Sequence, residues 1–246
     1  MSTAIVVTSG KGGTGKTSLT AAVSSCLAAL GSRVLCIDMD VGLRNLDLAL
    51  GLSDRALMDF TDVLAGRCTL ERAAVSHPVV ENLSLLTAPV TFPCQAITFP
   101  QMRALVQQAK AQYDYVLMDS PAGLGAGFEL AVCAADRAIV VSTTDASALR
   151  DAQRTVTLLR NSLERIHLVV NRVQPKLLRR LHATIDDAMD EAGLPLLGVV
   201  PEDPQVMLSA NQEQLLILST NKGAALAYLN IARRLLGQRV PLMKLR

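Results

Sequence analysis

The segment Gly10-Lys11-Gly12-Gly13-Thr14-Gly15-Lys16-Thr17 lies between a short apolar run, Ala4–Thr8, and a long helix-forming stretch, Lys16–Leu30. It fits the pattern GxxxxGK[ST], in which glycines let successive backbone N–H groups turn inward toward phosphate oxygens. The helix that follows adds further N–H donors and the positive end of its dipole. The sequence therefore predicts a strand, a phosphate-binding loop and a helix, in this order.

The motif ends with two side chains suited to a nucleoside triphosphate. We expect the Lys16 ammonium to reach the β- and γ-phosphates and the Thr17 hydroxyl to bind Mg²⁺. ATP and Mg²⁺ are therefore the expected cofactors. The residues of this segment predicted to contact the nucleotide are Gly10, Lys11, Gly12, Gly13, Thr14, Gly15, Lys16, Thr17 and Ser18.

Short apolar runs alternate with helix-forming stretches along the rest of the chain. The predicted strands are Ala4–Thr8, Arg33–Ile37, Leu83–Thr87, Tyr115–Met118, Ala138–Ser142, His167–Val170 and Leu196–Val200. The predicted helices are Lys16–Leu30, Pro100–Gln112, Phe128–Ala134, Ala146–Asn161, Leu177–Ala192 and Lys222–Leu236. Strands that are apolar on both faces favour a mainly parallel sheet between two layers of helices, because both faces must be covered. We predict one doubly wound α/β domain over residues 1–246, with a short basic tail at about 237–246.

Acidic residues follow two of the predicted strands. Asp38 and Asp40 come after the second strand, and Asp119 comes directly after Tyr115–Met118. Because ligands of a doubly wound sheet bind beyond the carboxyl ends of its strands, we expect all three carboxylates near the phosphates. We assign Asp119 to holding the metal through water, Asp38 to the outer Mg²⁺ shell and Asp40 to orienting the attacking water. The alternative for Asp38 or Asp40 is a cap on the following segment.

Lys11 is a second lysine that ordinary phosphate-loop chemistry does not require. With it, the loop resembles that of the deviant Walker A ATPases, the MinD/ParA group of P-loop NTPases. The run Gly42-Leu43-Arg44-Asn45-Leu46-Asp47 resembles the first switch segment of the MinD family, and the resemblance extends from Ile5 to about Pro241. It implies a slow, partner-stimulated ATPase that regulates septum placement and forms a homodimer with ATP. In that dimer Lys11 reaches the phosphates of the other subunit and acts in catalysis with Lys16 and Asp40.

The same resemblance assigns further residues around the nucleotide. It places Asn45 at the γ-phosphate region and Gly123 in a second switch, where a glycine N–H can face the same phosphate. It places the adenine beside two more strand ends, which carry Asn171, Arg172, Pro201, Glu202 and Asp203. An asparagine amide donates and accepts at once, which suits adenine. Ordinary loop chemistry is the alternative, because Asn and Pro are common at strand ends.

Partner contacts are also implied by the resemblance. The run Ala148-Leu149-Arg150-Asp151-Ala152-Gln153-Arg154 resembles the region with which the family binds the MinC division inhibitor, although Gln153 replaces an acidic residue. Asn211-Gln212-Glu213 and Leu86–Pro100, with Cys94, also depart from the family pattern. Family members end in an amphipathic membrane helix. Here residues 233–246 carry five basic groups and no acid, so we expect weak contact with anionic membrane in the ATP state.

Composition excludes several classes of protein. Of 246 residues 50% are hydrophobic and the net charge is +2, which argues against disorder. No apolar run reaches the roughly 18 residues of a membrane span, and the N-terminus does not resemble a signal peptide. Five scattered cysteines without a CxxC pattern suggest reduced thiols and a cytoplasmic protein. The small net charge and the 3% of aromatic residues argue against nucleic acid as a partner.

Four alternative functions share these features. The nitrogenase iron protein has this type of loop but needs cluster-binding cysteines, for which Cys94 and Cys133 lack the setting. A ParA-type partition ATPase would need basic surfaces for DNA. A nucleotide-gated scaffold would bind ATP and barely hydrolyse it. A MinD-like paralogue that positions flagella or other cargo is the alternative within the family.

Overall fold

The computed structural model describes residues 2–91 and 97–243. Within these ranges the elements follow the chain in the order β1 (Thr3–Thr8), α1 (Lys16–Ala29), β2 (Val34–Asp38), α2 (Leu46–Leu50), α3 (Phe60–Leu64), α4 (Leu70–Ala73), β3 (Val75–Ser76), β4 (Leu83–Leu86), α5 (Phe99–Gln112), β5 (Tyr115–Asp119), α6 (Ala126–Cys133), β6 (Arg137–Ser142), α7 (Ala146–Leu159), β7 (Ile166–Val173), α8 (Pro175–Leu181), α9 (Ile185–Ala192), β8 (Leu196–Pro201), α10 (Pro204–Asn211), α11 (Leu216–Ser219) and α12 (Gly223–Leu235). The seven predicted strands are all present.

Eight strands in this part of the chain form one sheet in the order β3-β4-β2-β5-β1-β6-β7-β8. Neighbouring strands run parallel except at one edge, where the two-residue strand β3 pairs antiparallel with β4. The chain winds outward in opposite directions from β1, which makes the carboxyl end of β1 the topological switch point of the sheet. The phosphate loop leaves the sheet at this point.

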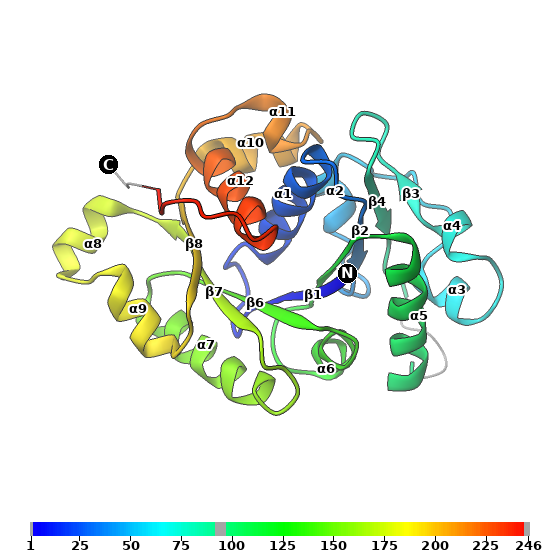
Figure 1. The fold of residues 1–246 in the computed structure, drawn as a ribbon, viewed down its shortest axis with the longest axis horizontal. Coiled ribbons are helices and arrows are strands. Elements are labelled where there is room, and N and C mark those ends of the chain that lie inside the picture. The colour runs from blue at the N-terminus through cyan, green and yellow to red at the C-terminus, as the bar shows by residue number, and fades with distance from the viewer. Residues whose placement is uncertain (1, 92–96, 244–246) are drawn as a thin grey trace.

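Helices cover both faces of the sheet (Figure 1). On one face α1, α2, α10, α11 and α12 pack over a core that includes Ile5 and Val7 of β1. On the other face α5, α6, α7 and α9 pack over a core that includes Ala4 and Val6 of the same strand. Alternate residues of one strand therefore enter different cores, as burial on both faces requires. The predicted doubly wound α/β fold is confirmed.

The prediction of one helix over Leu177–Ala192 is wrong, because the chain forms two helices there. Helix α8 ends at Leu181 and His182 takes a left-handed conformation with φ +51°. Helix α9 then starts with a capping box, in which the Thr184 hydroxyl accepts from the Asp187 N–H at 3.1 Å. The sequence prediction also omits β3 and the short helices α2, α3, α4, α10 and α11, most of which span fewer than two turns and have no clear periodicity.

The predicted basic tail lies back against the domain as far as the structure describes it. After α12 the segment Gln238–Met243 is not helical. The Arg234 guanidinium donates to the carbonyls of Leu197, Val240 and Pro241 at 2.9, 3.1 and 2.8 Å. Met243 packs, partly buried, against the core next to α12. The last part of the predicted tail, residues 244–246, lies outside the described residues.

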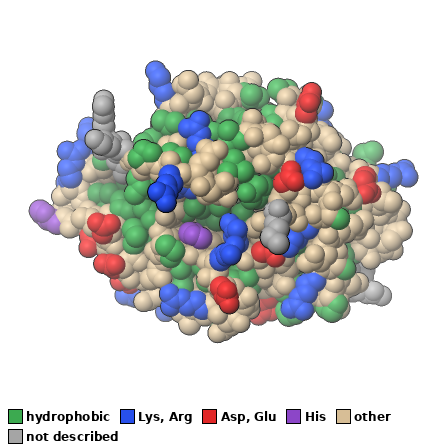
Figure 2. Space-filling model, viewed as in Figure 1, with side chains coloured by type: hydrophobic (Ala, Val, Ile, Leu, Met, Phe, Trp, Pro, Cys, Tyr) green, Lys and Arg blue, Asp and Glu red, His purple; other side chains and the backbone are tan. Residues whose placement is uncertain are grey.

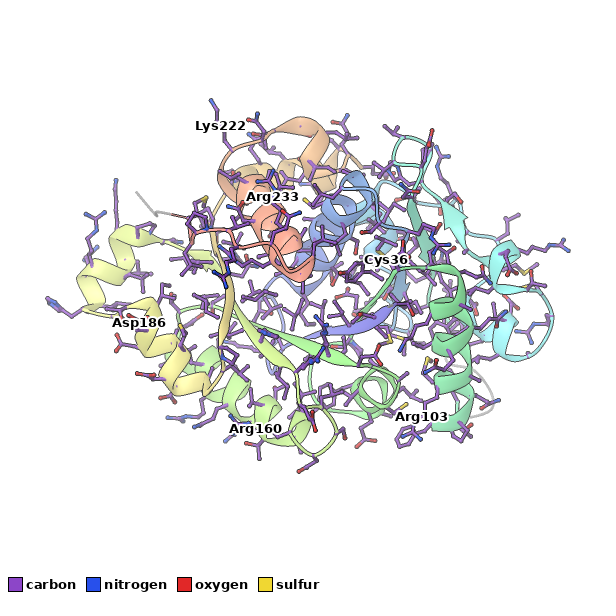
Figure 3. All side chains as sticks on the ribbon, in the orientation of Figure 1. Cys36, Arg103, Arg160, Asp186, Lys222 and Arg233 are labelled. Atoms are coloured by element: carbon purple, nitrogen blue, oxygen red, sulfur yellow. The ribbon has the colours of Figure 1, made fainter. Side chains whose placement is uncertain are left out.

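The cysteines divide into two groups. Cys26 and Cys36 are buried core residues, and burial raises the pKa of the Cys36 thiol to about 12 (Figure 3). Cys68 and Cys133 are only partly buried and pack against the core. Cys94, in the divergent segment Leu86–Pro100, lies outside the described residues. Among the described helices, none has the length and apolar character needed to cross a membrane.

Candidate active site

The phosphate loop requires glycine next to the start of α1. Gly15 has φ +89°, a conformation that side-chain-bearing residues rarely adopt. A Cβ at Gly15 would also lie 2.3 Å from Nδ2 of Asn171. Glycine at this position therefore lets the loop turn tightly, so that the first N–H groups of α1 point into the site.

Two threonines of α1 hold the carboxylate at the end of β5. The Thr17 hydroxyl donates to Asp119 Oδ2 at 2.7 Å, and the Thr20 hydroxyl donates to Asp119 Oδ1 at 3.1 Å. Thr17 and Asp119, which were both predicted to serve the metal, are thus brought together. Thr20 was not predicted, although its position three residues after Thr17 puts it one helical turn further along the same face.

Asp38 anchors the segment that leads from β2 to α2. Its Oδ1 accepts from the Asp40 N–H at 2.8 Å and its Oδ2 from the Leu46 N–H at 3.2 Å. Both oxygens therefore hold backbone, as the capping alternative anticipated, and the role of Asp38 in the outer Mg²⁺ shell stays a prediction. Asp40 lies close enough to Lys16 for their charges to interact. Among the described residues no group of three His, Cys, Asp or Glu side chains could hold a metal ion. The Thr17 hydroxyl beside the Asp119 carboxylate fits Mg²⁺ held by a hydroxyl, by phosphates and by water, the form this ion prefers.

Burial shifts the ionisation of these groups in a consistent direction. It raises the pKa of Asp119 to about 7, with a further contribution from the neighbouring Asp38, and it raises the pKa of Asp38 to about 6. Burial also lowers the pKa of Lys16, although Asp119 and Asp40 oppose that shift. Burial therefore favours the neutral form of both carboxyls, and a bound cation would favour their charged form.

The substitution Asp119→Asn should stabilise the metal-free protein at pH 8. The folded-state pKa of Asp119 lies above its unfolded value of 3.8, so the free energy of unfolding falls as the pH rises from about 4 to about 7. Asparagine keeps the shape without the charge, and we expect a higher melting temperature at pH 8 and a smaller gain at pH 5. Thermal denaturation without nucleotide measures both, and lower stability of Asp119→Asn at pH 8 would contradict the assignment. Asp114→Asn is the control and should not gain stability, because Arg33 lowers the pKa of that exposed carboxyl.

A bulge in β7 places the next two functional residues. Between Val170 and Val173, β7 has one more residue than β8. Asn171 turns inward and its Nδ2 donates to the Thr14 carbonyl at 2.8 Å. Arg172, with φ +55°, turns outward, pairs with Glu202 at 2.8 Å and donates to the Gly13 carbonyl at 3.1 Å. Both residues brace the phosphate loop, a role that the sequence prediction of an adenine contact did not include.

A cavity of about 600 Å³, here called the nucleotide pocket, opens beside the loop. Ten of the predicted residues line it: Gly13, Gly15, Lys16, Thr17, Ser18, Asn171, Arg172, Pro201, Glu202 and Asp203. The sequence prediction omitted its apolar wall, which consists of Pro204, Val206, Met207, Ala210 and Tyr228. This combination of N–H donors with an apolar wall suits a nucleotide.

Asp203 lines this pocket, but its carboxylate is used for structure. Oδ1 accepts from the Gln205 N–H at 3.0 Å and caps α10. Oδ2 accepts from the Ala224 N–H at 2.9 Å at the start of α12. This carboxylate therefore holds two helices beside the pocket.

The remaining predicted residues lie outside the nucleotide pocket. Gly10, Gly12, Thr14, Asn45 and Gly123 do not line it, and their contacts with the nucleotide stay predictions. Lys11 also points elsewhere, because its Nζ donates to the Ser147 hydroxyl of α7 at 2.9 Å. Helix α7 lies directly on the loop, since a Cβ at Gly10 would come within 2.3 Å of the Asp151 carbonyl oxygen.

Comparison with known proteins agrees with this geometry. Residues 5–217 match the CbiA family, described as the CobQ/CobB/MinD/ParA nucleotide binding domain. The septum site-determining protein MinD of Synechocystis sp. is 43% identical over 99% of this chain and 92% of its own length. The chain belongs to the MinD family. This family is a group of P-loop ATPases, so the chain is a nucleotide-binding ATPase.

Solved MinD structures share the whole fold. MinD in the MinC:MinD cell division protein complex of Aquifex aeolicus is 38% identical, with a TM-score of 0.92 over 99% of both chains. MinD of Pyrococcus horikoshii, solved with Mg-ADP, is 29% identical, with a TM-score of 0.81 over 96% of both chains. The expected resemblance to MinD is thereby confirmed. Of the two cysteines considered for the iron-protein alternative, Cys133 has a thiol that contacts the Leu130 carbonyl within α6 at 3.1 Å, and Cys94 lies outside the described residues.

Proposed function

We propose that this chain is a MinD-type switch, which binds Mg-ATP, pairs with a second copy of itself and acts in placing the division septum. The septum role rests on the family, whose matching members are septum site-determining proteins. The pairing rests on one observation. Lys11 belongs to the phosphate loop but does not line its own nucleotide pocket. A phosphate contact by Lys11 is therefore better satisfied by the nucleotide of another subunit, where it would act as a finger supplied in trans.

The chemical roles follow from the positions of the side chains. Lys16 lines the pocket at the phosphate end, and Thr17 with Asp119 serves Mg²⁺. Mg²⁺, when bound, would neutralise charge on the β- and γ-phosphates. Asp40, close to Lys16, orients the attacking water. Hydrolysis stays slow until a partner completes the arrangement of the switch segments.

The substitution Asp40→Ala tests the proposed cycle. It removes the residue that orients water but none of the phosphate contacts, so the variant should bind ATP and accumulate as a dimer. Its turnover should fall at least about 100-fold. Sedimentation velocity with ATP and with ADP, together with phosphate release, measures both effects. A monomeric Asp40→Ala variant in ATP would make Asp40 a structural residue instead, and a wild-type chain that stays monomeric would refute the dimer itself.

We also propose a MinC-like inhibitor as a partner. MinD of Aquifex aeolicus has been solved in complex with MinC. In this chain the corresponding candidate surface is the start of α7, where Arg150 and Arg154 lie near Asp151. Nucleic acid is not proposed as a partner, because basic side chains lie scattered among acidic and apolar ones on the face seen in Figure 2.

Membrane contact is proposed to be weak and dependent on ATP. The described tail lies along the domain and leaves Arg239 and Leu242 exposed. Pairing of two chains would present two such tails at once. We expect salt-sensitive co-sedimentation with anionic vesicles in ATP, and loss of binding when residues 238–246 are deleted. Arg239→Ala with Leu242→Ser is a milder variant that should also bind less. Binding that survives high salt or the deletion would refute this contact.

A further inference from the structure

A second cavity, of about 500 Å³, adjoins the phosphate loop and is here called the α8 cavity. It shares Gly13, Arg172 and Glu202 with the nucleotide pocket, so the Arg172–Glu202 ion pair forms a wall between the two. Lys11 lines the α8 cavity and does not line the nucleotide pocket. The proposed function gives Lys11 a role in pairing, but it gives none to Leu177 and Leu181, which also line this cavity.

One wall of the cavity is the phosphate loop itself, which contributes Lys11, Gly12, Gly13 and Thr14.

The opposite wall is apolar and exposed. Leu177 and Leu181 of α8 line the cavity and are 42% and 58% exposed. They lie four residues apart and therefore on one face of the helix. Leu178 on another face is buried, so α8 is already held to the domain without them. These two leucines consequently form an unpartnered apolar contact surface.

The charges favour a second copy of this chain as the occupant. The cavity carries two basic and two acidic side chains, Lys11, Arg172, Asp145 and Glu202. Such a balanced set suits a self-complementary two-fold contact better than a polyanion. The Lys11 side chain is only four methylenes long. If Lys11 contacts another subunit, that subunit must therefore lie close to the mouth of the α8 cavity.

We infer that Leu177 and Leu181 form an apolar contact of the ATP-bound dimer, in which the second copy closes the α8 cavity over the phosphate loop. This inference rests on the proposed ATP-dependent pairing and specifies part of its interface. Helix α8 thereby joins the phosphate loop in recognising the partner subunit, and by symmetry each chain supplies the same contact.

The test compares aspartate substitutions in an Asp40→Ala background that accumulates the dimer. Leu177→Asp with Leu181→Asp should weaken the ATP-dependent dimer at least about 30-fold in sedimentation velocity, because two charges would then be buried in an apolar contact. The affinity of the monomer for fluorescent ADP should stay within twofold, since neither leucine lines the nucleotide pocket. Leu218→Asp, at a residue on α11 that is 55% exposed, is the matched control and should leave the dimer intact.

A second measurement does not depend on substitutions. Hydrogen exchange of the unsubstituted chain should show protection of α8 amides in ATP relative to ADP, while α11 stays unchanged. A dimer unaffected by the double substitution, together with α8 unprotected in ATP, would overturn the inference and leave the proposed function standing. If the unsubstituted chain does not pair in ATP at all, the proposed function fails first and the inference falls with it.

Discussion

Replacing Lys16 with alanine is expected to lower the affinity for ATP at least about 100-fold and to abolish turnover. Lys16 is largely buried at the phosphate end of the nucleotide pocket, where burial lowers its pKa and the charges of Asp119 and Asp40 oppose that shift. Removal of one partner from a desolvated charge pair costs about 2–5 kcal/mol, which corresponds to this loss. Titration with a fluorescent ATP analogue measures the affinity, and phosphate release measures the turnover.

The control for Lys16 is an exposed lysine that does not line the nucleotide pocket. Lys222 is exposed immediately before α12 (Figure 3), and Lys222→Ala should bind and hydrolyse ATP as the unsubstituted chain does. Both variants should fold, which far-ultraviolet circular dichroism checks. If Lys16→Ala binds ATP as tightly as the unsubstituted chain, backbone N–H groups alone hold the phosphates.

Replacing Lys11 with alanine should have an equally large effect, but on dimer formation and turnover rather than on nucleotide affinity. We expect no ATP-dependent dimer at concentrations where the unsubstituted chain pairs, and a fall in turnover of about 1000-fold, the lower range for a finger supplied in trans. Affinity for ADP should stay within a few fold, because Lys11 lies outside the nucleotide pocket and contacts Ser147 instead. Sedimentation velocity, phosphate release and ADP titration together separate pairing from binding.

Lys11→Arg gives a matched comparison with retained charge. A guanidinium has a different shape from an ammonium, so partial pairing with reduced turnover is the expected result. If Lys11→Ala pairs and turns over normally, Lys11 is an ordinary surface lysine, and the proposed dimer would need another explanation.

Much of the site is predictable from the sequence because its signals are local. The glycine spacing before Lys16 and Thr17 defines the loop, and Asp119 ends an apolar run that can only be a buried strand. In a doubly wound sheet these local signals converge, since the carboxyl ends of parallel strands meet at one edge. The contact of Thr17 with Asp119, 102 residues away, follows from that topology.

Other features depend on contacts that no local pattern encodes. Asn171 bonds to Thr14, 157 residues distant, and Asp203 caps a helix that starts 20 residues later. Both residue types are common at strand ends for many reasons, so the sequence alone cannot distinguish a brace from an adenine contact. The break between α8 and α9 was missed for a different reason, because the capping box at Thr184 lies inside an otherwise helical run.

The bulge in β7 limits how this segment can vary in length. Its single extra residue makes Asn171 face the loop and Arg172 face Glu202. Deleting one residue would exchange these orientations and bring a guanidinium against the Thr14 carbonyl, with the apolar residues that follow turned away from their core. Substitution at either position changes one contact, whereas a change of length disrupts all of them. Insertions, tags or chimaera junctions are therefore best kept out of the segment between Val170 and Val173.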